Sequence, residues 1–141
     1  MPNLRNLIQI ITANFNSLDN INIGTLFNKV ILIMRHQKRL NDEIALVKSK
    51  ILTMLSRSAH PSHQQLISIL SHTANNEWLD LAAEKLGPEY EAHIERMTKL
   101  EAAISQIEIG QYGYCCDCEE KISDQRLEQD PASQRCEKCA H

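Results

Sequence analysis

The chain has 141 residues and a formal net charge of −3 from 15 basic and 18 acidic side chains, so its surface as a whole is not suited to the phosphates of nucleic acid. Its hydrophobic fraction is 43%, but only 4% of residues are aromatic and four are glycine, which favours a mainly α fold over a β-sandwich. The longest apolar run covers residues 30–34, far short of the roughly 20 residues that span a membrane. With no recognisable signal peptide, we expect a cytoplasmic protein with no membrane partner.

The first predicted elements are a short amphipathic N-terminal helix, roughly residues 4–15, and a long helix that follows a turn. Asn22 or Thr25 is the candidate N-cap of the long helix. Its apolar positions recur in alternating steps of four and three, which places them along one seam of a coiled-coil-like helix. The seam consists of Leu26, Val30, Ile33, polar Gln37, Leu40, Ile44, Val47, Ile51 and Met54.

The segment after this helix, residues 58–76, contains no Asp, Glu, Lys or Arg. His60-Pro61 ends the first helix, because the residue before proline is disfavoured in the α region. A short helix from Ser62 to about His72 follows, and Asn75 or Asn76 caps the next turn. The tip of a hairpin would lie either at 58–63 or at 72–76, and periodicity does not distinguish the two.

Trp78, the single tryptophan, lies beside the second of these candidate tips. One interpretation is that it is exposed there, since exposed aromatic side chains often anchor a protein partner. The other is that it folds back onto the short helix at Leu66, Ile67 and Leu70. Both interpretations remain open at the level of sequence.

A second heptad-like seam begins at residue 86 and ends before Gly110, a typical C-terminal helix signal. Residues 29–57 hold seven basic and two acidic side chains, whereas residues 77–109 hold three basic and eight acidic ones. Opposite charges beside two apolar seams favour pairing of one helix with the other, as an antiparallel hairpin. The positions of the second seam are Leu86, Tyr90, His93, Met97, Leu100, Ile104 and Ile107.

All five cysteines lie within residues 115–139, and they include two C-x2-C pairs separated by 17 residues. A two-residue gap lets one tight turn present two thiolates to a tetrahedral ion, so this spacing predicts one Zn²⁺. Disulfides are disfavoured in a reducing compartment. The predicted ligands are Cys115, Cys118, Cys136 and Cys139, and they leave Cys116 as a spare thiol.

This predicted zinc module is unsuited to catalysis and to DNA binding. Four cysteines close the coordination shell, which indicates a structural metal and not an enzyme. Residues 115–141 hold seven acidic and four basic side chains, so direct sequence-specific DNA binding is not expected. We therefore divide the chain into a helical region, 1–110, and a zinc-finger module, 111–141.

The motif Y-G-Y-C-x2-C, followed by Arg126-Leu127-Glu128-x2-Pro131 before the second cysteine pair, resembles the DksA/TraR zinc-finger family and its small DksA-like proteins. This resemblance implies a helical hairpin fused to a four-cysteine zinc finger. Family members bind bacterial RNA polymerase and insert the hairpin tip into the secondary channel, altering transcription without reading DNA. RNA polymerase is therefore the implied partner.

The resemblance also suggests which residues would act at the tip. The tip motif of the family is D-x-x-D-x-A, and residues 77–82 are similar, with Glu77 in place of the first Asp. By this resemblance Glu77, Trp78, Asp80 and Ala82 are candidate partner-binding residues, and the tip lies at 72–80. In the finger, Glu119 stands where the family usually has glycine.

Two other functions remain as alternatives to a transcription regulator. The chain would serve as a zinc-stapled helical adaptor if its hairpin docks to another protein. It would act as a zinc or redox sensor if the spare thiol of Cys116 responds to oxidation.

Overall fold

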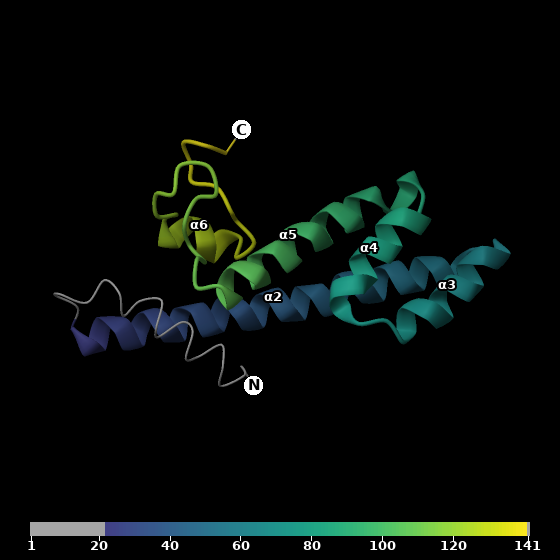
Figure 1. Cartoon of the computed structure of the whole chain (residues 1–141), viewed down its shortest axis with the longest axis horizontal. Coiled ribbons are helices and arrows are strands. Elements are labelled where there is room, and N and C mark those ends of the chain that lie inside the picture. Colours follow the sequence, from purple (N-terminus) through teal and green to yellow (C-terminus); the bar gives the residue numbers. More distant parts are fainter. Residues whose placement is uncertain (1–21, 141) are drawn as a thin grey trace. The chain divides into compact units, whose positions relative to one another are not determined.

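The computed structural model describes residues 22–140 and confirms the predicted mainly α fold. Within these residues an isolated bridge between Tyr114 and Lys121 is the one β-type pairing. The predicted helix at residues 4–15 lies outside the described range. None of the described helices combines the length and apolar character needed to cross a membrane. The elements, labelled as in Figure 1, are α2 (Ile23–Arg57), α3 (Pro61–Ser71), α4 (Asn75–Lys85), the 3-10 helix η1 (Pro88–Tyr90), α5 (Glu91–Glu108) and α6 (Asp124–Gln129).

The start of α2 follows the predicted capping, and α3 begins at Pro61, one residue before the predicted Ser62. The Asn22 side chain accepts the backbone N–H of Gly24 at 3.2 Å, so Asn22 caps α2. Pro61 is the first residue of α3, where its missing N–H costs nothing. His60 precedes it with an extended backbone, and its ring nitrogen accepts the N–H of Ser62 at 3.3 Å.

The start of α4 differs from the prediction. Asn75 was expected to cap this helix, as an alternative to Asn76, but it is instead the first helical residue. Ala74 occupies the cap position and makes no side-chain hydrogen bond there. The prediction was wrong because Asn is favoured near helix starts in general, and the pattern does not specify which of several adjacent positions is the cap.

The described chain divides into two compact units, and α2 and α5 each run through both of them. One unit holds residues 42–99, that is, the second part of α2, all of α3 and α4, and the first part of α5. The other holds residues 22–41 and 100–140, which include the cysteine-rich segment. The predicted boundary at 110/111 concerns the finger and stays a prediction.

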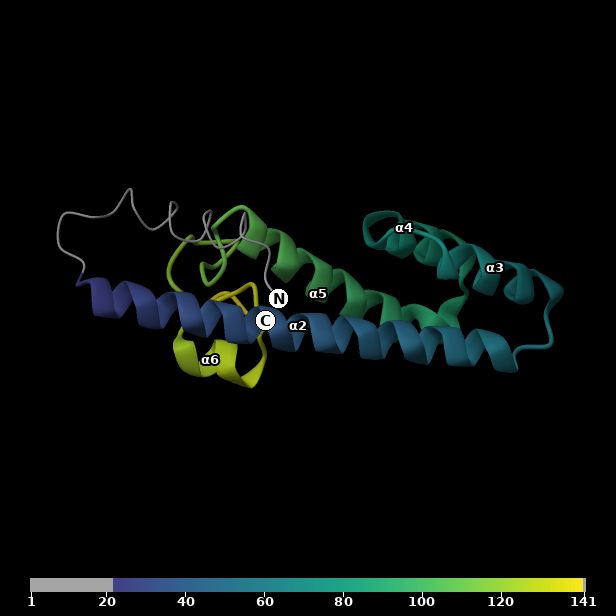
Figure 2. The same ribbon diagram turned by 90° about the horizontal axis from the view of Figure 1, so that it is seen from below.

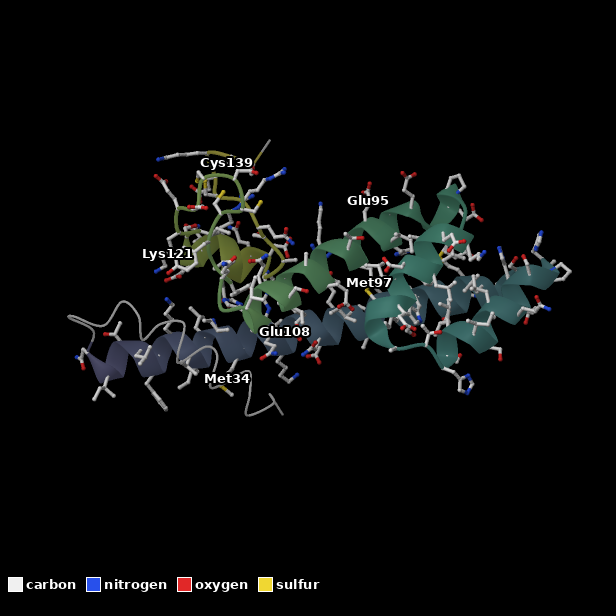
Figure 3. All side chains as sticks on the ribbon, viewed as in Figure 1. Met34, Glu95, Met97, Glu108, Lys121 and Cys139 are labelled. Atoms are coloured by element: carbon white, nitrogen blue, oxygen red, sulfur yellow. The ribbon has the colours of Figure 1, made fainter. Side chains whose placement is uncertain are left out.

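In the unit of residues 42–99, most positions of the two predicted seams are buried in the core, whereas Met54, Leu86 and His93 are only half-buried. Figure 3 shows Met97 and Glu95 on different sides of α5, and Met97 is fully buried while Glu95 is exposed. Arg96 donates two hydrogen bonds to the carboxylate of Glu43 on α2, at 2.7 and 2.9 Å. Glu43 is one of the two acidic residues in the mainly basic segment 29–57, and Arg96 is one of the three basic residues in the mainly acidic segment 77–109. Other buried residues of this core are Ile44, Val47, Ile51, Leu55, Leu66, Leu70, Trp78, Ala82 and Tyr90.

The connection between α2 and α5 contains turns at both predicted positions. Residues 58–60 separate α2 from α3, and residues 72–74 separate α3 from α4. The hairpin is therefore joined through two additional helices that pack into the core of this unit, through Leu66 and Leu70 of α3 and Trp78 of α4.

In the unit of residues 22–41 and 100–140, the predicted Gly110 terminates α5, whose last helical residue is Glu108. Gly110 adopts a φ of 75°, which a glycine reaches without steric cost. The N–H of Gly110 bonds the carbonyl of Ile107 at 3.1 Å, and the N–H of Gln111 bonds that of Gln106 at 2.9 Å. These two bonds form a Schellman motif, which turns the chain from α5 into the cysteine-rich segment. In both views α6 lies beside the first part of α2 (Figures 1 and 2).

Candidate metal centre

The four predicted ligands come together at one point. The sulfur atoms of Cys115, Cys118, Cys136 and Cys139 all lie within 4.8 Å of one another. Zinc–sulfur bonds of about 2.3 Å give a tetrahedron whose edge is about 3.8 Å. The Cys118 and Cys136 sulfurs are 3.6 Å apart, close to that edge and too far for a disulfide. The donor set therefore fits one structural Zn²⁺.

The first cysteine pair is held by a tight turn. The N–H of Cys115 bonds the carbonyl of Glu120 at 2.8 Å, and the N–H of Glu119 bonds the carbonyl of Cys115 at 3.0 Å. Glu119 adopts a φ of 62°, a left-handed conformation that favours glycine. The turn therefore forms with a non-glycine residue at this position, at the cost of local backbone strain.

The second cysteine pair is held in a similar way. The amides of Cys139 and Ala140 both donate to the carbonyl of Cys136, at 3.1 and 3.0 Å. Cys115 and Cys136, the first cysteine of each pair, are buried, whereas Cys118 is exposed. Each pair thus contributes one sulfur from the interior of the finger and a second from nearer its surface.

The electrostatics of the cluster favour a cation. Backbone hydrogen bonds, first from Cys118 and then from Cys136, lower the pKa of Cys115 to about 6. The pKa of Cys139 is raised to about 12, first by its hydrogen bond to the Cys136 sulfur. One sulfur is thus readily ionised while a neighbour keeps its proton in a hydrogen bond between the sulfurs. A bound dication takes the place of such protons and allows all four thiols to ionise.

The spare thiol lies outside the ligand cluster. Cys116 is exposed, and its N–H bonds the carbonyl of Gln134 at 2.8 Å. Its sulfur is 3.8 Å from a carboxylate oxygen of Asp117, which also pairs with Arg135 at 2.8 Å. The backbone of Cys116 therefore joins the two halves of the finger, while its side chain remains on the surface.

The residues of the Arg-Leu-Glu-x2-Pro motif stabilise the finger without touching the metal site. Ser123 caps α6 through the N–H of Arg126, at 3.2 Å. The side chain of Arg126 donates to the carbonyl of Arg135 at 2.8 Å, immediately before Cys136. Leu127 is buried. The motif therefore fixes the loop that returns the second cysteine pair.

The end of the motif makes two further connections. The hydroxyl of Tyr112, a buried residue just after α5, donates to the carbonyl of Pro131 at 2.6 Å. Glu128 accepts a hydrogen bond from Arg35 of α2 at 2.6 Å, and its carboxylate is 3.9 Å from Arg39. These contacts attach the finger to the first part of α2.

His36 is a residue that the heptad pattern did not indicate. It is 1% exposed on α2, and neither ring nitrogen has a hydrogen-bond partner among the described residues. Burial lowers its pKa, opposed by the Glu128 carboxylate 3.8 Å away. Its ring centroid is 6.1 Å from that of Tyr112. The imidazole is therefore held neutral beneath the finger.

The structure separates the four predicted tip residues into two pairs. Glu77 and Asp80 are exposed on α4, whereas Trp78 and Ala82 are 2% and 0% exposed. The exposed interpretation of Trp78 is wrong, because the indole packs into the core of its unit, with the Lys48 ammonium 5.3 Å from its ring centroid. Trp78 and Ala82 orient α4, and Glu77 and Asp80 remain accessible.

Comparison with known proteins bears on the C-terminal segment alone. No curated protein and no solved structure matches the chain. Residues 110–141 match the family described as the prokaryotic DksA/TraR C4-type zinc finger. That range contains all four clustered cysteines and the complete Arg-Leu-Glu-x2-Pro motif. The C-terminal segment, residues 110–141, is therefore similar to the zinc finger of the DksA/TraR family.

Proposed function

We propose that this protein regulates transcription in the cytoplasm by binding bacterial RNA polymerase through protein contacts, without reading DNA and without catalysis. The family of its finger supports a transcription-related role. The finger itself has seven acidic and four basic side chains in residues 115–141, so phosphate contacts would be weak. Four sulfurs around one ion leave no open position for a reaction. The zinc module, 111–141, is then a clamp, and contact with the polymerase falls to the helical region, 1–110.

The observation that carries this proposal is the orientation of α4. Trp78 and Ala82 lie four residues apart on its buried face, and they fix the rotation of the helix about its axis. Glu77 and Asp80 lie three residues apart and are both exposed. The carboxylate that resembles the second Asp of the family tip motif is thus presented to a partner by a helix with a well-packed inner face.

The test is binding and transcription with purified bacterial RNA polymerase. Asp80→Asn preserves the shape of the side chain and removes its charge, and Glu95→Gln is the matched control at an exposed acid on α5. We expect the zinc-loaded protein to bind the polymerase and alter the output of some promoters in a panel. Asp80→Asn should reduce that effect about tenfold, in the range of a charged contact in an interface, while Glu95→Gln leaves it unchanged.

Two outcomes would refute the proposal. One is the absence of binding to core and holoenzyme at micromolar concentrations. The other is an unchanged promoter response with Asp80→Asn, provided that circular dichroism shows the variant to be folded. Capture of a different protein from the native cell, together with either outcome, would favour the adaptor alternative.

A further inference from the structure

A pocket of about 270 Å³ opens beside the finger, within the unit of residues 22–41 and 100–140. One side is formed by α2, including Lys29, Leu32 and His36. The other side is formed by Tyr114, Lys121 and Leu127 of the finger; Figure 3 labels Lys121 there. Neither the zinc site nor the proposed polymerase contact uses this pocket.

The size of the pocket limits what it can hold. A cavity of about 150 Å³ accommodates benzene, whereas pockets for drug-sized ligands measure roughly 300–1,000 Å³. A volume of about 270 Å³ therefore suits one aromatic ring with a short substituent.

The lining residues indicate an apolar body with a negative charge. Leu32, Ile33 and Leu127 supply apolar surface. Lys29 and Lys121 supply two ammonium groups against a single lining carboxylate, that of Asp124. This local excess of positive charge contrasts with the net −3 of the whole chain.

Two aromatic features reinforce this conclusion. The Lys29 ammonium lies 5.9 Å from the ring centroid of Tyr114, so charge and aromatic surface occur together in the lining. The ring of His36 also lines the pocket and adds aromatic surface to it, while its two nitrogens are themselves buried.

We propose that this pocket is a binding site for a small aromatic carboxylate. The ring of the ligand lies against the Leu32 and Leu127 side, and its carboxylate is held by Lys29 and Lys121. The proposal does not depend on the proposed polymerase contact, because the residues named for that contact, Glu77 and Asp80, lie on α4 and none of them lines the pocket.

Phenylacetate is the probe, added to the zinc-loaded full chain and followed by NMR of the His36 and Tyr112 ring resonances. A ligand of ten non-hydrogen atoms with a modest binding free energy per atom has a dissociation constant of about 1 mM. We expect saturable shifts near that concentration. Phenylacetamide, which has the same shape without the charge, and inorganic phosphate, which has charge without a ring, should each bind at least fivefold more weakly.

Lys121→Met removes one ammonium and should weaken phenylacetate binding about fivefold, as expected of a partly exposed ion pair. Lys138→Met is the matched control, since Lys138 is an exposed lysine of the finger that does not line the pocket.

The proposal would be overturned if the ring resonances did not shift at a phenylacetate concentration 10-fold above the expected dissociation constant. Equal binding of phenylacetamide would also overturn it, and would assign the pocket to neutral apolar groups such as a partner's side chain. Equal losses in the two lysine variants would overturn the assigned contact.

Discussion

The hydroxyl of Tyr112 offers the sharpest test of how the finger is attached to the end of α5. Tyr112→Phe keeps the ring and removes one oxygen, which leaves the carbonyl of Pro131 without its 2.6 Å hydrogen bond. Loss of a partner in a buried pair costs about 1–3 kcal/mol. We expect the free energy of unfolding to fall by that amount in urea titrations with zinc present. Tyr114→Phe is the matched control, because Tyr114 is 46% exposed and only two residues away; its effect should be within about 0.5 kcal/mol.

The buried hydroxyl of Tyr112 should also make the free energy of unfolding depend on pH in the alkaline range. Burial is the main cause that raises the pKa of Tyr112 above its ordinary value of 10.0. The folded state therefore keeps the phenolic proton at pH values where the unfolded chain has lost it. The resulting stabilisation is fully present below pH 10 and declines above it, by up to about 1.4 kcal/mol per pH unit. The difference in stability between the wild type and Tyr112→Phe should shrink as the pH rises through that range. Equal losses in the two Tyr variants at neutral pH, or a constant difference with pH, would refute the assigned hydrogen bond.

Three further predictions concern single residues. Glu119→Gly should raise the free energy of unfolding by about 0.5–1 kcal/mol in the same titration. The reason is that relief of about 1–2 kcal/mol of left-handed backbone strain exceeds the cost of about 0.4–1 kcal/mol from the greater entropy of the unfolded chain. A lower free energy of unfolding in this variant would contradict the φ of 62°. His36 has a lowered pKa, so the unfolded chain takes up a proton before the folded protein does as the pH falls through about 6.5. The free energy of unfolding should therefore decline below that pH by up to about 1.4 kcal/mol per pH unit. His36→Phe should remove this pH dependence, and an unchanged pH dependence would show that another group causes it. Trp78→Ala should cost about 3–5 kcal/mol in thermal unfolding, and the wild-type fluorescence should resist acrylamide quenching; efficient quenching would show that the indole is exposed.

The sequence predicted the long helices because their packing surfaces are periodic. Of the predicted seam in α2, the stretch from Val30 to Ile51 is buried at every position, including the polar Gln37. The prediction is wrong at the C-terminal end of the seam, where the predicted Met54 is only partly buried and the adjacent Leu55 is fully buried. That part of α2 belongs to the unit in which Leu66 and Trp78 of α3 and α4 also contribute to the core. A heptad pattern describes contact with one partner helix and does not record a second contact.

His36 shows the same limit at the other part of α2. It lies one position before Gln37 of the seam, so heptad spacing assigns it to a flank of the helix. That flank is covered by an irregular module, through the ring of Tyr112 and the carboxylate of Glu128. An irregular module imposes no period on the helix it covers, so neither the burial of His36 nor the pocket beside it could be foreseen. The metal cluster was predictable because C-x2-C spacing is dictated by the tetrahedral geometry itself.

Zinc binding requires the four sulfurs but places no demand on the Arg-Leu-Glu-x2-Pro segment between them. The structure gives that segment a separate role. Arg126 donates a hydrogen bond to the carbonyl of Arg135, immediately before Cys136, and the carbonyl of Pro131 accepts one from the hydroxyl of Tyr112, just after α5. Glu128 reaches Arg35 of α2, although half-exposed pairs of this kind contribute only about 0–1 kcal/mol. The segment therefore determines where the finger is attached more than how tightly it holds metal. A finger that kept its cysteines and lost this segment would still bind zinc, but it would no longer be fixed to the helices beside it.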